Sequence, residues 1–251
     1  MRFAQLLRSG AIAGGAAGLT AALVMWLHTE PVIRRALAIE EARGHTGGGH
    51  SHDEELVSRT AQVIAGALTA AVVGVLFGIV FAVVFAKVRH RLPGLSDHSR
   101  ALWLAVLGFL AFTAMPALAI PSNPPAVGDP GTVTRRTLIY VLAILVGLLV
   151  IAVVSSLDAA LRARQLQQPV RLTADLVASV GLVAVGLWLM PGTPDGIPSD
   201  VPAALIWDFR LASLTQLAAM WFVLGAVFGL LTSRAARMSG EVRDERFVSA
   251  S

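Results

Sequence analysis

The sequence predicts an all-α membrane protein built as a polytopic bundle of six transmembrane helices. Of its 251 residues, 55% are hydrophobic and only 14% are charged. Mean hydropathy is +0.70, and apolar runs recur along the whole chain. This composition leaves too little polar material to coat one or two soluble domains of the same length. We therefore expect a lipid bilayer to solvate most of the protein.

The apolar runs set the number of spans, since a helix needs about 20 such residues to cross a bilayer. A five-span alternative stays open, because the first run is short and the third contains Met115 and Pro116. The fifth also contains Asp175 near its start, and the sixth contains Gln216. Residues 1–233 are expected to form a single transmembrane domain and residues 234–251 a short cytoplasmic tail. The predicted spans are residues 11–27, 61–86, 102–120, 138–157, 172–190 and 211–231.

The distribution of basic residues predicts that both termini are cytoplasmic. With this orientation, 13 of the 20 basic residues fall inside, as the positive-inside rule requires. Ten of the 16 acidic residues fall outside, and a negative outer face concentrates cations. The basic excess is thus a topology signal of a cell (inner) membrane protein, and no nucleic-acid partner is expected. The inside residues are Arg2, Arg8, Lys87, Arg89, Arg91, Arg100, Arg162, Arg164, Arg171, Arg234, Arg237, Arg243 and Arg246.

A hydrophilic segment between the first two spans, residues 44–55, is the candidate metal site. It contains three of the six histidines next to three acidic residues. Neutral imidazole and carboxylate suit Co²⁺, Ni²⁺ and Zn²⁺, and the chain has no cysteine to add thiolate ligands. The alternative is a hydrophilic linker whose histidines have no task. The candidate ligands are His45, His50, His52, Asp53 and Glu54.

A second outer segment, residues 121–130, contains four prolines and is too rich in them for a helix. We call it the proline cap and expect it to hold the third and fourth spans rigidly. Asp129 and Asn123 are candidate oxygen ligands above a pathway. The alternative is a pair of turns that only orients the two helices.

Small residues and an aromatic segment predict how helices pack. Gly10, Gly14 and Gly18 share one face of the first span, and Gly74 and Gly78 share one face of the second, so each stripe lets another helix approach closely. The segment 205–210 contains Trp207, which suits a membrane interface, and leads into the last span. We expect Arg210 to pair with Asp208 or with another loop.

Enzymatic function has no positive support in the sequence. The only lysine is Lys87, and no glycine-rich phosphate-binding loop is present. The chain also lacks the His-Glu-x-x-His motif of zinc proteases and the Gly-x-Ser-x-Gly motif of serine hydrolases.

Three features together resemble the probable cobalt transporter subunit family, CbtA. They are the His-containing outer loop, the cap from Asn123 to Pro130 followed by Arg135 and Arg136, and the Trp207–Arg210 segment followed by Ser213, Leu214 and Gln216. The resemblance covers nearly the whole length. It implies a membrane subunit that takes up a cobalt ion as substrate and has no cofactor.

The resemblance also implies a small single-span partner subunit, CbtB, with its own His-rich segment, and a role in cobalt supply for cobalamin synthesis. This chain departs from the family in having three histidines in the loop rather than a longer tract, so the partner is expected to add to metal capture. The rival hypotheses are a non-transporting membrane scaffold and a transporter of nickel or another divalent metal.

Overall fold

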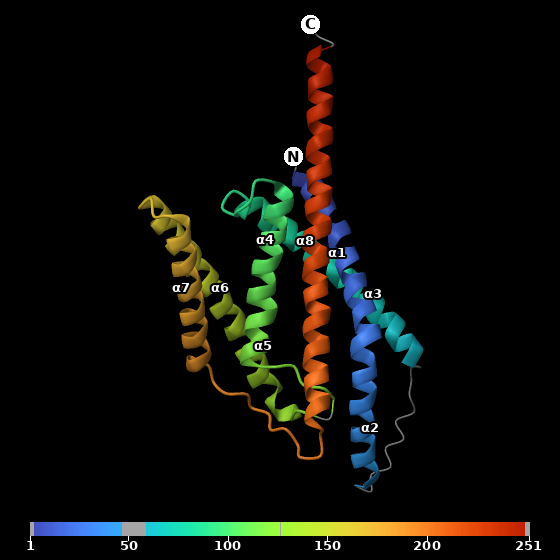
Figure 1. The fold of residues 1–251 in the computed structure, drawn as a ribbon. Coiled ribbons are helices and arrows are strands. Elements are labelled where there is room, and N and C mark those ends of the chain that lie inside the picture. Colours follow the sequence, from blue (N-terminus) through green and yellow to red (C-terminus); the bar gives the residue numbers. More distant parts are fainter. Residues whose placement is uncertain (1–2, 47–58, 126, 249–251) are drawn as a thin grey trace. The chain divides into compact units, whose positions relative to one another are not determined.

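A computed structural model confirms the all-helical class (Figure 1). Within the residues that it describes, six helical segments are long and apolar enough to cross a membrane. The structure describes residues 3–46, 59–125 and 127–248, and the side chains of 44–46, 59–60, 62–63 and 236–248 lie outside that description. The helical elements are α1 (Phe3–Val24), η1 (Met25–Thr29), α2 (Glu30–Thr46), α3 (Arg59–Val88), α4 (Asp97–Phe109), η2 (Leu110–Ala114), α5 (Met115–Ala119), η3 (Pro130–Thr132), α6 (Val133–Ala163), α7 (Gln168–Leu189) and α8 (Ala203–Val248).

Most helices extend beyond the apolar runs that predicted them. A helix satisfies its own backbone hydrogen bonds, so polar residues can continue it past the hydrocarbon region at little cost. The largest difference is in the first span, where α1, η1 and α2 form one continuous helical segment that ends at Thr46. Much of the segment expected to be an outer loop is therefore helical. At the other end, α8 continues past residue 233 without a break.

The chain divides into two compact units, and each is described by itself. Described residues 3–31, 59–106 and 215–248 form the first unit, and residues 32–46 and 107–214 form the second, with 126 outside the description. The single transmembrane domain expected from the sequence stays a prediction.

In the first unit, the glycine stripes of α1 and α3 pack against each other (Figure 1). A Cβ atom added to Gly14 would overlap the carbonyl oxygen of Gly74, and one added to Gly78 would overlap that of Gly10. The two backbones are therefore in direct contact, which only glycine allows at these positions. The predicted close helix approach is confirmed.

Aromatic side chains join α3 to α8 in the same unit. The ring of Phe228 packs edge-to-face on those of Phe81 and Phe85, with centroids 5.2 and 5.1 Å apart. Phe77 meets Trp221 in the same way at 5.0 Å. Edge-to-face pairs are the favoured aromatic geometry because the positive ring edge faces the negative ring face.

In the second unit, proline explains a wide turn in the third span. Pro116 has no N–H to donate to the carbonyl of Phe112, and the N–H of Met115 donates to Leu110, which gives the π-helical turn η2. The Tyr140 hydroxyl of α6 donates to the Phe112 carbonyl at 3.2 Å and replaces the missing donor. The Phe112 carbonyl thus receives a hydrogen bond from a neighbouring helix.

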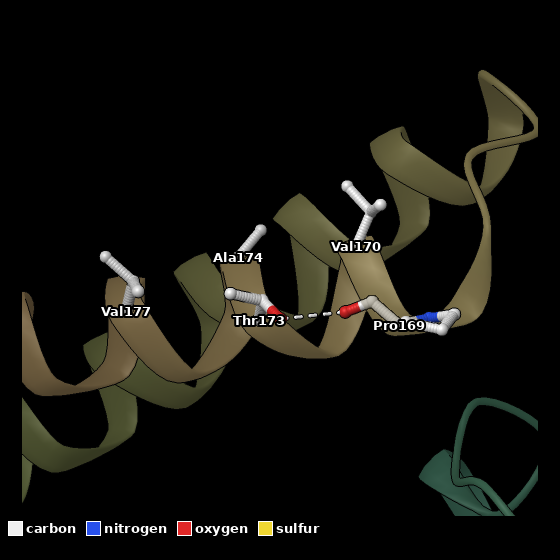
Figure 2. Close-up of a pocket in the computed structure, with 5 residues that line it drawn as sticks. All are labelled: Pro169, Val170, Thr173, Ala174 and Val177. Atoms are coloured by element: carbon white, nitrogen blue, oxygen red, sulfur yellow. Dashed lines mark hydrogen bonds between the residues drawn. The ribbon is translucent and has the colours of Figure 1, made fainter.

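The hairpin of α6 and α7 is closed at one end by ion pairs. Asp158 accepts hydrogen bonds from Arg162 at 2.6 Å and from Arg171 at 2.7 and 2.9 Å. No described residue of α7 is buried, and a shallow groove along it is lined by Pro169, Val170, Thr173, Ala174 and Val177 (Figure 2). One face of α7 packs against α6, and the exposed apolar residues on its other face fit contact with lipid.

Candidate metal-capture site

The proline cap is fixed to the loop before α8 by Asp195. The carboxylate of Asp195 accepts a hydrogen bond from the Thr132 hydroxyl at 2.5 Å and one from the Asp129 N–H at 3.3 Å, and it pairs with Arg136 at 3.4 Å. Its side chain is only 3% exposed. These contacts, led by the Thr132 hydrogen bond, lower the pKa of Asp195. The charged carboxylate of Asp195 therefore holds the cap to this loop.

Asp129, the candidate ligand in the cap, already has a structural task. Its Oδ1 accepts a hydrogen bond from the N–H of Gly131 at 2.8 Å, which caps the short helix η3. Its carbonyl oxygen accepts one from Thr132 at 2.7 Å. A metal ion at Asp129 would therefore be bound mainly through Oδ2.

Arg210 connects the start of α8 to the cap. Its Nη2 donates to Asn123 Oδ1 at 3.2 Å and its Nε to the Ser122 carbonyl at 3.4 Å. The guanidinium also lies over the Trp207 ring, 5.9 Å from its centroid. Of the two predicted roles for Arg210, pairing with another loop is confirmed, and the Asn123 oxygen is used in this contact.

Helix α2 packs on the cap and on the start of α8 within the second unit. Arg35 on α2 pairs with Asp208 of α8 at 2.9 Å. The cap therefore also packs against α2, the helix that leads to the histidine segment. The apolar core of this contact consists of Val32, Ala36, Val127, Val201, Leu205 and Ile206.

A second ion pair holds the far end of α2. Arg43 donates two hydrogen bonds to Asp200, from Nε at 2.7 Å and from Nη2 at 2.8 Å. The Arg43 hydrogen bond is the main reason why the pKa of Asp200 is lowered. The paired groups lie just before the histidine segment, so the segment begins at a fixed point.

The candidate ligands are only partly within the described residues. His50, His52, Asp53 and Glu54 lie outside them, and His45 lies in the last turn of α2 with its side chain outside the description. Within the described residues, no group of three or more histidine, aspartate or glutamate side chains is placed to hold a metal. The structure therefore places Asp129 and the backbone of His45 in the second unit but brings no complete ligand set together.

Several residues of this region were not singled out from the sequence. Asp195 and Asp200 are isolated acids in a loop rich in glycine and proline, and their partners are far away in the chain.

Comparison with protein families matches residues 3–233 to the family described as "Probable cobalt transporter subunit (CbtA)". The chain belongs to this family. The resemblance found in the cap and in the Trp207–Arg210 segment is confirmed, and with it a family of transporter subunits, whose role is not enzymatic. The six long apolar helices among the described residues indicate that this chain is a multi-pass membrane protein. Comparison with curated proteins and with solved structures finds no match.

Proposed function

We propose that this CbtA-family protein is the membrane-spanning subunit of an uptake system for a divalent transition metal, with Co²⁺ as its substrate. The observation that carries the proposal is the family match over residues 3–233, nearly the whole chain. The protein would lie in the cell (inner) membrane with both termini in the cytoplasm, as the excess of basic residues on one side predicts. The acidic outer side would concentrate the cation before capture.

Capture would take place at the histidine segment through His45, His50, His52, Asp53 and Glu54. Two contacts in the second unit support this assignment. The Arg43–Asp200 pair fixes the end of α2 just before His45, and Asp195, in the same loop as Asp200, holds the backbone of Asp129. The loop that contains Asp195 and Asp200 therefore holds both Asp129 of the cap and the start of the histidine segment. Imidazole and carboxylate ligands on a chain segment favour exchangeable rather than permanent binding.

Two further parts complete the proposal. A small CbtB-like subunit with a single span would work with this chain and add histidines to the three found here. The driving force would come from the membrane potential, which is worth roughly 2.3 kcal/mol per charge for each 100 mV and therefore about twice that for a divalent ion. Uptake would then need no nucleotide hydrolysis by this chain.

The test is accumulation of radiolabelled Co²⁺ in cells depleted of other cobalt importers, with and without this protein and its small partner. We expect protein-dependent uptake that persists in excess Ni²⁺ and Zn²⁺. Replacing His45, His50 and His52 together with alanine should reduce uptake at low external Co²⁺ and leave it nearly unchanged at high concentration. His90→Ala, on the predicted inner side, is the matched control.

Each outcome separates the hypotheses. No metal flux from confirmed membrane-inserted protein, with or without the partner, would contradict transport and favour a membrane scaffold. Uptake that Ni²⁺ abolishes would make nickel the substrate. Unchanged low-concentration uptake by the triple variant would leave transport standing and remove the histidine segment from it.

A further inference from the structure

One oxygen atom of an acidic side chain on α7 is buried without a hydrogen-bond partner. Asp175 lies near the start of this helix, which is apolar enough to cross a membrane. Its Oδ1 atom is buried and accepts no hydrogen bond from the part of the chain that the structure describes. The Ser179 hydroxyl, one turn further along α7, donates to the carbonyl oxygen of Asp175 and not to its carboxylate. Acidic side chains in membrane helices are costly, and they usually mark a functional position.

The neighbouring carboxylate, Asp158 on α6, is already fully used. Its Oδ1 accepts two hydrogen bonds from Arg171, and its Oδ2 accepts one from Arg162. The charges of these three side chains all act on Asp175, but neither arginine donates a hydrogen bond to its Oδ1. Among the described residues, the charged groups that act on Asp175 are therefore one acid and one arginine on α6 and one arginine on α7.

These neighbours favour opposite protonation states of Asp175. Burial of Oδ1 and the negative charge of Asp158 favour the neutral carboxylic acid, whereas the two guanidinium groups favour the carboxylate. The residue is only partly buried as a whole, which gives a proton a route to it. Asp158 differs, because its oxygens accept charge-assisted hydrogen bonds that favour the ionised form. Of the two acids, Asp175 is the one that can take up and release a proton.

A proton suits this position better than a metal ion does. Asp158 has no free oxygen to offer, so Asp175 alone would supply the carboxylate ligands. Within the described residues, no group of three or more histidine, aspartate or glutamate side chains is placed to hold a metal. The two guanidinium groups would also repel a divalent cation. A proton needs only one oxygen atom.

We propose that Asp175 is a proton-binding site at the end of the α6–α7 hairpin, and that its protonation opposes the entry of the metal ion. The second part rests on the transport function above. The Asp175 carboxylate takes a proton from the aqueous solution to form an O–H bond and returns it there on release. With the carboxylate ionised, the four charged side chains are neutral overall, and with it protonated they carry one positive charge. That charge repels an entering divalent cation most strongly where water is excluded.

The test of the binding site is infrared spectroscopy of the purified full-length protein over a range of pH. We expect the wild type to show the C=O stretching band of a carboxylic acid that is absent from Asp175→Asn and that disappears as the pH rises to about 8, within the range known for buried acids. Glu40→Gln, which alters an exposed carboxylate on α2, is the control and should keep the band. Identical carboxylic-acid bands in wild type and folded Asp175→Asn at every pH would overturn the site.

Asp175→Glu is the second variant, used if Asp175→Asn does not elute as a single species. It keeps a carboxyl group but moves it by one methylene group relative to Asp158 and the arginines. The pH at which the band disappears should therefore shift. A band and a titration equal to those of the wild type would overturn the assignment to this residue.

Co²⁺ uptake into proteoliposomes tests the second part. The protein is reconstituted with its small partner, and both sides are buffered at the same pH so that no proton gradient contributes. Wild-type uptake should slow several-fold as the pH is lowered through the range in which the band appears. Asp175→Asn resembles the protonated form and should be slow at every pH.

The outcomes separate the two parts from the proposed function. An Asp175-dependent band together with equal pH dependence of uptake in wild type and Asp175→Asn would overturn the effect on transport and leave the proton site and the transporter standing. Absence of wild-type uptake at every pH would overturn the transport function and the effect on it, while the infrared result decides the site.

Discussion

Arg43 donates two hydrogen bonds to the carboxylate of Asp200, 157 residues further along the chain, at 2.7 and 2.8 Å. The fork of the guanidinium matches the two carboxylate oxygens, a geometry that fixes orientation as well as distance. Since His45 follows two residues after Arg43, this pair sets where the histidine segment begins. We therefore expect this ion pair to matter more for metal capture than for the free energy of unfolding, because both side chains are partly exposed to solvent.

The first prediction exchanges the two charges. Arg43→Asp or Asp200→Arg alone places like charges together, and each should reduce uptake at low external Co²⁺ by several-fold while the protein still folds. The double variant restores opposite charges and should recover part of the loss. Radiolabelled Co²⁺ uptake measures the effect, with exposed His90→Ala, far from the pair in the chain, as control. Wild-type uptake by both single variants would show that the position of the segment is unimportant.

The second prediction concerns the contact between α1 and α3. Gly14→Val adds a branched side chain where even a Cβ would overlap the Gly74 carbonyl, and neither backbone can move without separating the helices. We expect a loss of about 1–3 kcal/mol in the free energy of unfolding, typical of overpacking. Gly15→Ala is the matched control, since its Cβ would meet only a methyl group of Val75 at 3.4 Å. Thermal unfolding in detergent compares the two, and equal midpoints would contradict the packing argument.

The spans could be predicted from the sequence, because a helix that crosses lipid needs an apolar run of sufficient length. The glycine stripes predicted close approach, but small residues do not name their partner, so the pairing of Gly14 with Gly74 required the structure. The end of the first helix was misjudged for a similar reason. Hydropathy falls after Leu27, yet α2 continues because its apolar face packs against the cap. These two segments are distant in the chain.

The candidate site was less predictable than the fold. The histidine segment and Asp129 stand out by residue type, whereas Asp195 is a single acid whose partners, Thr132 of η3 and Arg136 of α6, lie far earlier in the chain. Glu30 gave a weak signal, since an acid just past an apolar run looks like a helix end in water. Glu30 is nevertheless buried, in a helical segment that continues past that run.

The third prediction is a pH dependence from Asp195. Its pKa is lowered in the folded protein, chiefly by the Thr132 hydrogen bond, so the charged form stabilises the fold above the unfolded value of about 3.9. That stabilisation should be lost as pH falls through the lower folded value. Asp195→Asn should therefore be less stable than wild type at neutral pH, and the difference should shrink toward pH 3. Thermal unfolding across this range measures it, and a constant difference would contradict the assignment.

The last prediction tests the repair of η2 by Tyr140. Tyr140→Phe removes the hydroxyl that donates to the Phe112 carbonyl and should cost about 0.6 kcal/mol, up to about 1.7, as measured for hydrogen bonds between membrane helices. Pro116→Ala supplies the N–H that proline lacks, so the carbonyl can regain its α-helical donor. In that background Tyr140→Phe should cost clearly less. The double-mutant cycle isolates this coupling from the cavity that Pro116→Ala leaves in a fully buried site. Equal costs of Tyr140→Phe in both backgrounds would mean that the hydroxyl does not replace the donor lost at Pro116.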